Sequence, residues 1–234
     1  MRSKKFARVL PTCIFVTLGA CSRPEETPAP AAAAQPAAEA AAAPSAEATA
    51  LPPELVARLV RPHSPVFGPA RAPVTVVEVL DPACEACKAY APVVEQLLFT
   101  YPEDVRVVVR YADFHPVSLQ AIRLLEAARA QGKAHELLAA LFERQQEWAS
   151  HAAPNPARAW LIANDVGINV KRAKKDALAS SVDDMLNLEA KDLDALKVER
   201  TPTFFVNGKA LPVFGAQELV NLVASEVRAA KSNK

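Results

Sequence analysis

The sequence predicts an α/β domain whose central sheet is interrupted, along the chain, by a block of helices. Two segments dense in β-branched residues, 74–80 and 105–112, have the composition of buried strands. A third strand segment, at 203–215, contains the hairpin-forming pair Asn207-Gly208. Roughly eighty residues with helical spacing of apolar side chains separate it from the first two. These observations favour one sheet with a large helical insertion.

The helices follow from the apolar spacing, taken in chain order. A short helix is predicted at 53–61, before a proline-rich approach to the first strand. A second occupies 85–101, and Pro92 should kink it. An amphipathic helix at 216–231 closes the chain. The insertion, placed at about 115–197, shows apolar stripes at i, i+3 and i+4 over the segments 116–133, 134–149, 155–167, 169–180 and 181–196.

Composition limits the class of protein. The 234 residues are 51% hydrophobic, which suits one domain with a sizeable apolar core. Four cysteines are too few for a disulfide framework. The net charge of +1 arises from four basic side chains among the first twenty residues, without which 23 basic residues face 26 acidic ones. This balance indicates no nucleic-acid partner.

The N-terminus is typical of an export signal. A basic stretch precedes an apolar run of about ten residues, which is too short to span a bilayer but suits a signal-peptide core. The sequence "LGAC" at 18–21 resembles a bacterial lipobox, and this resemblance implies cleavage before Cys21 and acylation of that cysteine. A plain secretory signal with an incidental cysteine is the alternative. If Cys21 is acylated, Cys13 is removed, and Cys84 and Cys87 are the thiols that remain.

The predicted organisation is therefore a lipoprotein signal peptide at 1–20, a lipid-anchored tether at 21–52 and the folded domain at 53–234. The tether is rich in alanine and proline and has no aromatic residue, so burial cannot offset its ordering entropy. Ser22 is not the aspartate that retains such lipoproteins in the inner membrane. The resemblance thus implies the periplasmic side of a Gram-negative envelope, with the outer membrane favoured.

The sequence "VEVLDPACEACKAYAP" at 76–91 places a Cys-x-x-Cys pair where a helix should begin. A structural zinc site needs about four ligands, and the histidines are scattered singly, so no metal is expected. A passive disulfide around so small a loop would stabilise the fold only weakly. A redox pair explains the position of Cys84 and Cys87 best. A helix N-terminus lowers the pKa of a thiol, and a partner one turn deeper can resolve a mixed disulfide.

The strand that leads into this pair resembles the thioredoxin superfamily, and the later helical block resembles its DsbA-type branch. The resemblance covers about 64–230. It rests on the stretches "SPVFGPARAPVTVVEVLDPACEAC", "FHPVSLQAIRLLEAARAQGK" and "ERTPTFFVNGKAL". It implies a thioredoxin fold with an inserted helical subdomain and thiol–disulfide oxidoreductase activity. The redox-active disulfide Cys84-Cys87 would serve in place of any cofactor.

The resemblance also assigns roles to single residues. Cys84 matches the exposed nucleophile and Cys87 the buried resolving thiol. Pro202 matches a cis-proline that faces the cysteines, and the backbone of Thr201 is offered to the substrate. Glu78 matches an acidic residue that accepts a proton from the buried thiol. Strand alternation alone leaves open whether Glu78 points to solvent instead.

The dipeptide between the cysteines, Glu85-Ala86, departs from strongly oxidising relatives, which place thiolate-stabilising groups there. A carboxylate at Glu85 should disfavour the Cys84 thiolate by like-charge repulsion, with Lys88 as a partial offset. We therefore expect a redox potential nearer that of thioredoxin than that of a strong oxidase. His115 is a weaker candidate for a place near the site.

The leading hypothesis is a membrane-tethered, extracytoplasmic thiol–disulfide oxidoreductase that acts on protein thiols and disulfides. The direction of exchange, oxidase or reductase, stays open. A membrane redox partner would reset the pair, and a monomer is expected because only the tether and one short helix precede the domain. Two alternatives remain. One is a lipoprotein that handles Cu(I) through the cysteine pair, and the other is a redox-inactive binding module.

Overall fold

The structure is a computed structural model that describes residues 48–232. The predicted signal peptide, Cys21 and most of the predicted tether lie outside the described residues. Within 48–232, none of the helices combines the length and the hydropathy that a membrane crossing requires.

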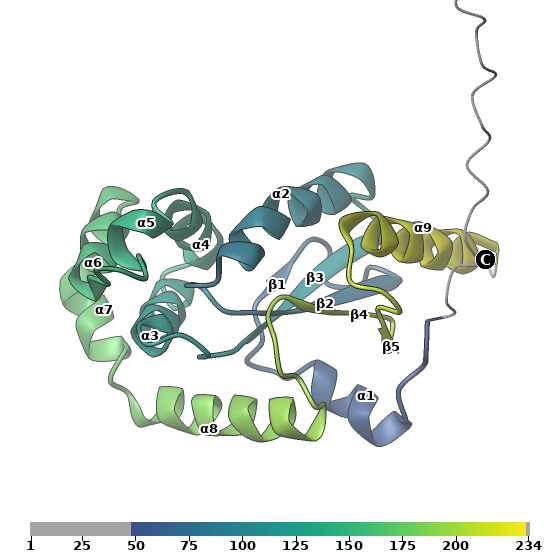
Figure 1. Ribbon diagram of the computed structural model, residues 1–234, viewed down its shortest axis with the longest axis horizontal. Coiled ribbons are helices and arrows are strands. Elements are labelled where there is room, and N and C mark those ends of the chain that lie inside the picture. Colours follow the sequence, from purple (N-terminus) through teal and green to yellow (C-terminus); the bar gives the residue numbers. More distant parts are fainter. Residues whose placement is uncertain (1–47, 233–234) are drawn as a thin grey trace, which may run out of the picture. The chain divides into compact units, whose positions relative to one another are not determined.

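A mixed sheet of five strands, in the order β1-β3-β2-β4-β5, forms the centre of the fold (Figure 1). The parallel pair β2 and β3 lies in its middle, and the other pairings are antiparallel. Both middle strands are almost completely buried, which their density of valine predicts. The strands are β1 (Val66–Phe67), β2 (Val74–Leu80), β3 (Val105–Tyr111), β4 (Thr203–Val206) and β5 (Lys209–Ala210).

Helices cover both faces of this sheet, and a helical subdomain lies beside it (Figure 1). On one face α2 and α9 pack against the strands, and on the other face α1 and α8 do. The helices α3 to α7 pack around a core of their own that reaches the cysteine pair. The helices are α1 (Pro53–Leu59), α2 (Glu85–Thr100), α3 (Ser118–Arg129), α4 (Ala134–Glu143), α5 (Gln145–Trp148), α6 (Pro156–Asp165), α7 (Val170–Asp176), α8 (Ser180–Ala195) and α9 (Ala216–Ser232).

The predicted order of strands and helices is confirmed, with local differences. The helix predicted at 134–149 is divided at Arg144, whose backbone (φ −100°, ψ 24°) leaves the helical region. The strand β1 has only two residues, too few for a pattern to reveal it. Residues 49–51, assigned to the tether, instead bond to the β4–β5 hairpin through Gly208 and Ala210. The folded part therefore begins before residue 53.

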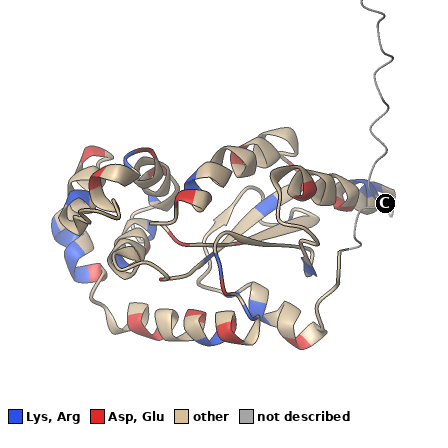
Figure 2. Ribbon diagram, viewed as in Figure 1, with Lys and Arg blue, Asp and Glu red and all other residues tan. Residues whose placement is uncertain are grey.

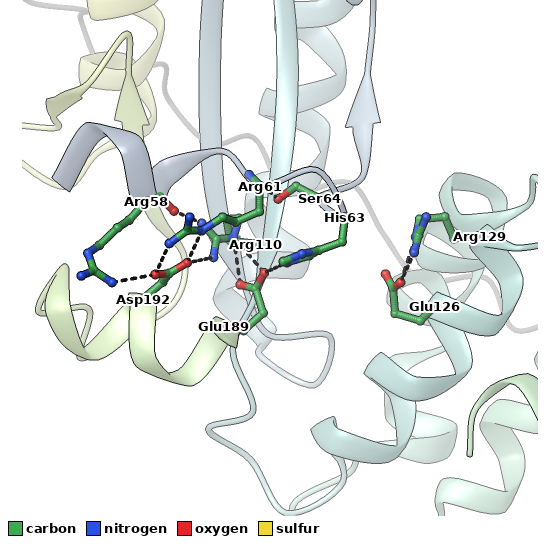
Figure 3. A network of polar contacts seen from close by, with 9 residues as sticks. All are labelled: Arg58, Arg61, His63, Ser64, Arg110, Glu126, Arg129, Glu189 and Asp192. Atoms are coloured by element: carbon green, nitrogen blue, oxygen red, sulfur yellow. Dashed lines mark hydrogen bonds and ion pairs between the residues drawn. The ribbon is translucent and has the colours of Figure 1, made fainter. Parts of the chain in front are cut away.

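A buried ionic network joins α8 and the segment after α1 to the lower face of the sheet (Figure 3). Arg110 of β3 is fully buried and donates to Glu189 at 2.9 Å and to Asp192 at 3.0 Å. Arg61 donates to Asp192 at 2.7 Å, and His63 lies 2.7 Å from Glu189. Burial opposes the ionisation of Asp192, but hydrogen bonds from its arginine partners outweigh it and hold the pKa of Asp192 at about 2. The buried carboxylates of Glu189 and Asp192 therefore stay ionised, because each is paired with arginine.

The helical subdomain contains both tryptophans and the lysine- and arginine-rich helix α7. Trp148 is fully buried and donates its indole N–H to the carbonyl of Leu141 at 2.9 Å, while Trp160 packs at the edge of the same core. The lysine and arginine side chains of α7, blue in Figure 2, are exposed. They form a solvated helix face, as the charge pattern predicts.

Candidate active site

The cysteine pair lies where β2 ends and α2 begins. Cys84 is the N-cap of α2, with an extended backbone, and Glu85 is the first helical residue. Cys84 is 7% exposed and Cys87, one turn into the helix, is 0% exposed. Both are free thiols. Cys84 is therefore mostly buried, where the resemblance implies an exposed nucleophile, but it keeps a small exposed fraction that Cys87 lacks.

The β4 side of the site comes from a loop more than a hundred residues away in sequence. The Thr201-Pro202 peptide bond is cis. The Sγ of Cys84 donates to the carbonyl oxygen of Thr201 at 3.3 Å. This loop therefore places a backbone carbonyl directly against the outer sulfur.

The two thiols have opposite acid–base properties. The pKa of Cys84 is lowered to about 5, chiefly by a hydrogen bond from the Cys87 thiol; burial opposes this, and hydrogen bonds with Thr201 and with the backbone N–H groups of Cys87 and Ala86 lower it further. The same thiol–thiol hydrogen bond, followed by burial, raises the pKa of Cys87 far above its usual value. The negative charge is therefore held on the outer sulfur, at the helix N-terminus.

Asp81 fixes the loop that carries the cysteines, a role that no local pattern in the sequence predicts. Its carboxylate is fully buried and accepts hydrogen bonds from the backbone N–H groups of Ala83 and Phe114, both at 2.8 Å. It also accepts from the hydroxyl of Ser118 and lies 2.8 Å from Nδ1 of His115. The Asp-Pro step before the pair was a signal for a turn, but its long-range partners were not visible in the sequence.

The expected effect of Glu85 needs correction. Its carboxylate lies 2.9 Å from Nε2 of His151, which comes from the loop between α5 and α6. The hydrogen bond from His151 is the first cause that lowers the pKa of Glu85. Repulsion from Glu85 is absent from the causes acting on Cys84, whose pKa falls rather than rises. His115 lies near this pair, with 6.1 Å between its ring and that of His151.

Glu78 points into the protein and not to solvent. It pairs with Val109 on one side and Phe204 on the other, and it is 4% exposed because α2 and α4 cover this face of the sheet. Burial, and secondly the charge of Glu95, raise the pKa of Glu78 to about 8. The charge of Glu78 in turn contributes to the raised pKa of Cys87. The two groups are therefore electrostatically coupled.

Gln145 of α5 also belongs to the site, although no motif in the sequence marks it. Its side-chain amide donates to the carbonyl oxygens of Pro82 and Cys84, both at 3.1 Å. The helical subdomain thereby holds the active-site loop directly. Across residues 48–232, no group of three or more histidine, cysteine, aspartate or glutamate side chains is arranged to hold a metal ion.

A family model described as thioredoxin matches residues 61–222. The Na(+)/H(+) antiporter NhaA 1 of Mycobacterium sp. (strain KMS) is 32% identical over 170 residues, which are 68% of this chain and 26% of the antiporter. The antiporter NhaA 3 of Salinispora tropica is 33% identical over 147 residues, 62% of this chain and 22% of the antiporter. The chain thus spans about a quarter of the length of these curated relatives.

Solved structures share the fold. A thioredoxin-like oxidoreductase from Silicibacter pomeroyi is 27% identical, with a TM-score of 0.62 over 72% of this chain and 94% of the other. BdbD from Bacillus subtilis is 22% identical, with a TM-score of 0.63 over 71% and 94%. The alpha-DsbA1 of Wolbachia pipientis is 16% identical, with a TM-score of 0.66 over 75% and 96%. The predicted thioredoxin fold with an inserted helical subdomain is confirmed.

Proposed function

The chain belongs to the thioredoxin family, and from this premise we propose that it is a thiol–disulfide oxidoreductase that exchanges disulfides with protein substrates through Cys84 and Cys87. The observation that carries the proposal is the asymmetry of the two sulfurs. Cys84 keeps a small exposed fraction and has a pKa of about 5, so it is a thiolate at neutral pH. Cys87 is buried and keeps its proton.

This asymmetry supports a defined order of bond changes for the reduction of a client disulfide and for the oxidation of a client dithiol. In reduction of a client, the Cys84 thiolate attacks the client disulfide and one client sulfur leaves as a thiolate. Cys87 then loses its proton and attacks Cys84, the mixed disulfide breaks, and the second client sulfur leaves. Oxidation of a client dithiol is the reverse, with Cys87 as the leaving thiolate. The low pKa of Cys84 also makes it the better leaving group whenever a sulfur displaces it.

A shallow groove beside the cis-proline supports polypeptide clients. Its walls include Pro202, Leu211 and Phe214, and its volume is about 310 Å³. Val213 and Phe214 are at least half exposed, although both are apolar. An extended client chain would pair with the backbone at Thr201, in place of the contact with Cys84, and cover these side chains. We propose Thr201 and Pro202 as the substrate-binding residues on this ground.

We extend the proposal to the cellular setting that the N-terminal pattern indicates. Acylated Cys21 would anchor the protein to the membrane, outer membrane favoured, and the tether would let the domain reach clients on the periplasmic side. A membrane redox partner would return Cys84 and Cys87 to their working state. Glu78 would take and return the proton of Cys87.

Covalent trapping tests the proposed function. In a Cys87→Ala variant, Cys84 can form mixed disulfides with clients but cannot resolve them, so adducts should accumulate in cells and run as reducible bands on non-reducing gels. The matched control is Cys84→Ala, which should trap nothing because Cys87 is buried.

Two other outcomes would count against the proposal. A Cys87→Ala protein with a free Cys84 and no adducts would exclude protein clients and favour a binding module. Purified wild-type protein that retains Cu(I) but leaves the thiols of a reduced, unfolded client unchanged would favour copper handling.

A further inference from the structure

Glu78 is a buried carboxyl group that no residue within 48–232 pairs with or hydrogen-bonds. It is 4% exposed and lies on β2 between Val109 of β3 and Phe204 of β4. Each of the other buried charged side chains in this part of the chain lies within 3.0 Å of a group that can carry the opposite charge, and these are Asp81, Arg110, Glu126, Glu189 and Asp192. Proteins pair their buried charges because it is costly to remove an isolated charge from water. Glu78 therefore has a hydrogen-bonding capacity that the described residues leave open.

Glu78 lines a pocket of about 310 Å³ that α2 and α4 form with the sheet. The rings of Phe67 and His135 lie 4.6 Å apart and form one aromatic edge of it. The volume is at the lower end of the range of about 300–1,000 Å³ for small-molecule sites. A cavity of about 150 Å³ holds benzene, so this pocket has room for an aromatic ring with a short chain. The rest of the inner wall is apolar and includes Leu80, Val94, Val109 and Phe142.

The charges that line the pocket favour a cationic ligand. At its mouth Glu95 lies 2.7 Å from His135, and both side chains are about half exposed. Lys88 donates to the backbone carbonyl of Glu143 at 3.4 Å, also at the mouth. Acidic and basic groups are thus both present at the mouth, whereas Glu78 is the ionisable group of the inner wall. An anionic ligand would place its charge beside Glu78 or bury it unpaired, and an ammonium group would supply the missing counter-charge.

We propose that this pocket binds a small organic amine, with its ammonium group against the carboxylate of Glu78 and its apolar body against Val94 and Phe142. The ammonium group would donate charge-assisted hydrogen bonds to the carboxylate oxygens, which are stronger than hydrogen bonds between neutral groups. The inference goes beyond the proposed function and does not depend on it, since neither cysteine lines the pocket.

Binding of the amine should release a proton from Glu78. Burial, and secondly the charge of Glu95, raise the pKa of Glu78 to about 8, so most of the free protein carries the neutral acid at pH 7. The ion pair forms when this acid loses its proton to solvent and the ligand keeps its own charge. The other ionisable groups that face the pocket are Lys88 and Glu95 of α2 and His135 and Glu143 of α4, and the neighbours on the sheet are apolar.

Calorimetry with three probes of similar shape tests the proposal. The cationic probe is phenethylamine, the neutral one is 2-phenylethanol and the anionic one is phenylacetate. Titrations of the reduced protein at pH 7 in phosphate and in MOPS, which differ in ionisation enthalpy, give both the affinity and the number of protons released.

Four variants accompany the wild-type protein. Glu78→Gln keeps the shape of the side chain and removes its charge. Ala91→Leu fills the pocket from α2, and Ala139→Phe fills it independently from α4. The matched control is Ala89→Leu, an exposed alanine of α2 outside the pocket lining.

We expect phenethylamine to bind the wild-type protein at least about tenfold more tightly than either other probe. It should release about one proton per molecule bound at pH 7. Glu78→Gln should lose both the preference and the proton release, the two filled variants should lose binding, and Ala89→Leu should behave as wild type. No binding of phenethylamine at millimolar concentration would overturn the inference. Equal affinity for the three probes, preference for phenylacetate, or proton release that persists in Glu78→Gln would overturn it as well.

Discussion

Cys84 and Cys87 are chemically the same side chain, and the fold separates their pKa values in opposite directions. The helix N-terminus and the Cys87 thiol stabilise charge on Cys84, while depth below the surface keeps Cys87 neutral. A pKa of about 5 for Cys84 lies between the values of ~7 for thioredoxin and ~3.5 for DsbA. The reduced form is stabilised accordingly, so we now expect an intermediate redox potential, more oxidising than Glu85 alone suggests.

The pairing of Glu85 with His151 gives a two-sided prediction. His151→Ala leaves the Glu85 carboxylate unpaired beside Cys84, so the pKa of Cys84 should rise. Glu85→Gln removes that charge, so the pKa of Cys84 should fall or stay constant. Each shift should be less than about one pH unit, because the pair is exposed. The measurement is the pH dependence of iodoacetamide alkylation, which should have its wild-type midpoint near pH 5.

A control variant keeps the hydrogen bond to Glu85 while it removes the imidazole. His151→Gln keeps a hydrogen-bond donor for Glu85, so its Cys84 midpoint should lie closer to that of wild type than the midpoint of His151→Ala does. Movement of the midpoint in the same direction for His151→Ala and Glu85→Gln would contradict the assigned role of the pair.

At the scale of single elements, β2 contains one charged residue, Glu78, among mostly apolar neighbours. Glu78 keeps its proton in the folded state up to about pH 8, whereas the unfolded chain releases it near the ordinary value of 4.5. Between these pH values the unfolded state binds fewer protons, so the free energy of unfolding falls as the pH rises. Above about pH 8 both states have released this proton, so Glu78 no longer changes the free energy of unfolding with pH.

Glu78→Gln should remove this fall. Relative to wild type, the variant should gain up to about 5 kcal/mol in unfolding free energy between about pH 4 and about pH 8. The measurement is urea denaturation across that range, with both proteins carrying Cys84→Ala so that the thiolate does not titrate. An unchanged difference at all pH values would show that Glu78 is already ionised in the folded protein.

The network around Arg110 makes a prediction for β3 and α8. Arg110→Ala leaves Glu189 and Asp192 buried with fewer partners and should lower the unfolding free energy by about 3–5 kcal/mol. Arg58→Ala removes another partner of the same Asp192 carboxylate, but from a side chain that is 40% exposed, and should cost less than about 1 kcal/mol. Chemical denaturation of both variants at neutral pH measures the contrast, and equal costs would contradict it.

At the scale of the whole molecule, the helical subdomain both covers and supplies the active site. Gln145 holds the cysteine loop, and His151 pairs with the residue beside the nucleophile. The sheet supplies the rest, since β2 ends at the cysteines and β4 begins just after Pro202. The neighbouring antiparallel strands β2 and β4 therefore bring together two parts of the site that lie more than a hundred residues apart in sequence (Figure 1).

The N-terminal pattern predicts where the molecule is held. Cys21→Ala should remove the lipid attachment site, so the protein should move from the membrane fraction to the soluble fraction of the cell envelope. Cys13→Ala is the matched control, because cleavage before Cys21 would remove residue 13 and leave the distribution unchanged. Fractionation with mass spectrometry of the N-terminal peptide measures both. An unmodified Cys21 in the mature wild-type protein would contradict the lipoprotein hypothesis.

The local pattern determined a large part of this protein. Runs of β-branched residues specified β2 and β3, apolar stripes specified most helices, and the two cysteines at a helix start specified the chemistry, because these properties depend on neighbours in sequence. The short strand β1 and the helix break at Arg144 were not predicted, since neither has a sequence pattern long enough to detect.

Only the tertiary structure decided which distant groups act on the cysteines. His151 pairs with Glu85, and Asp81 accepts hydrogen bonds from the segment before α3. The helices α2 and α4 cover the face of the sheet on which Glu78 lies beside a pocket. Each of these is an interaction between segments far apart in the chain. Electrostatic energies depend on distance and burial in space, and sequence order alone determines neither.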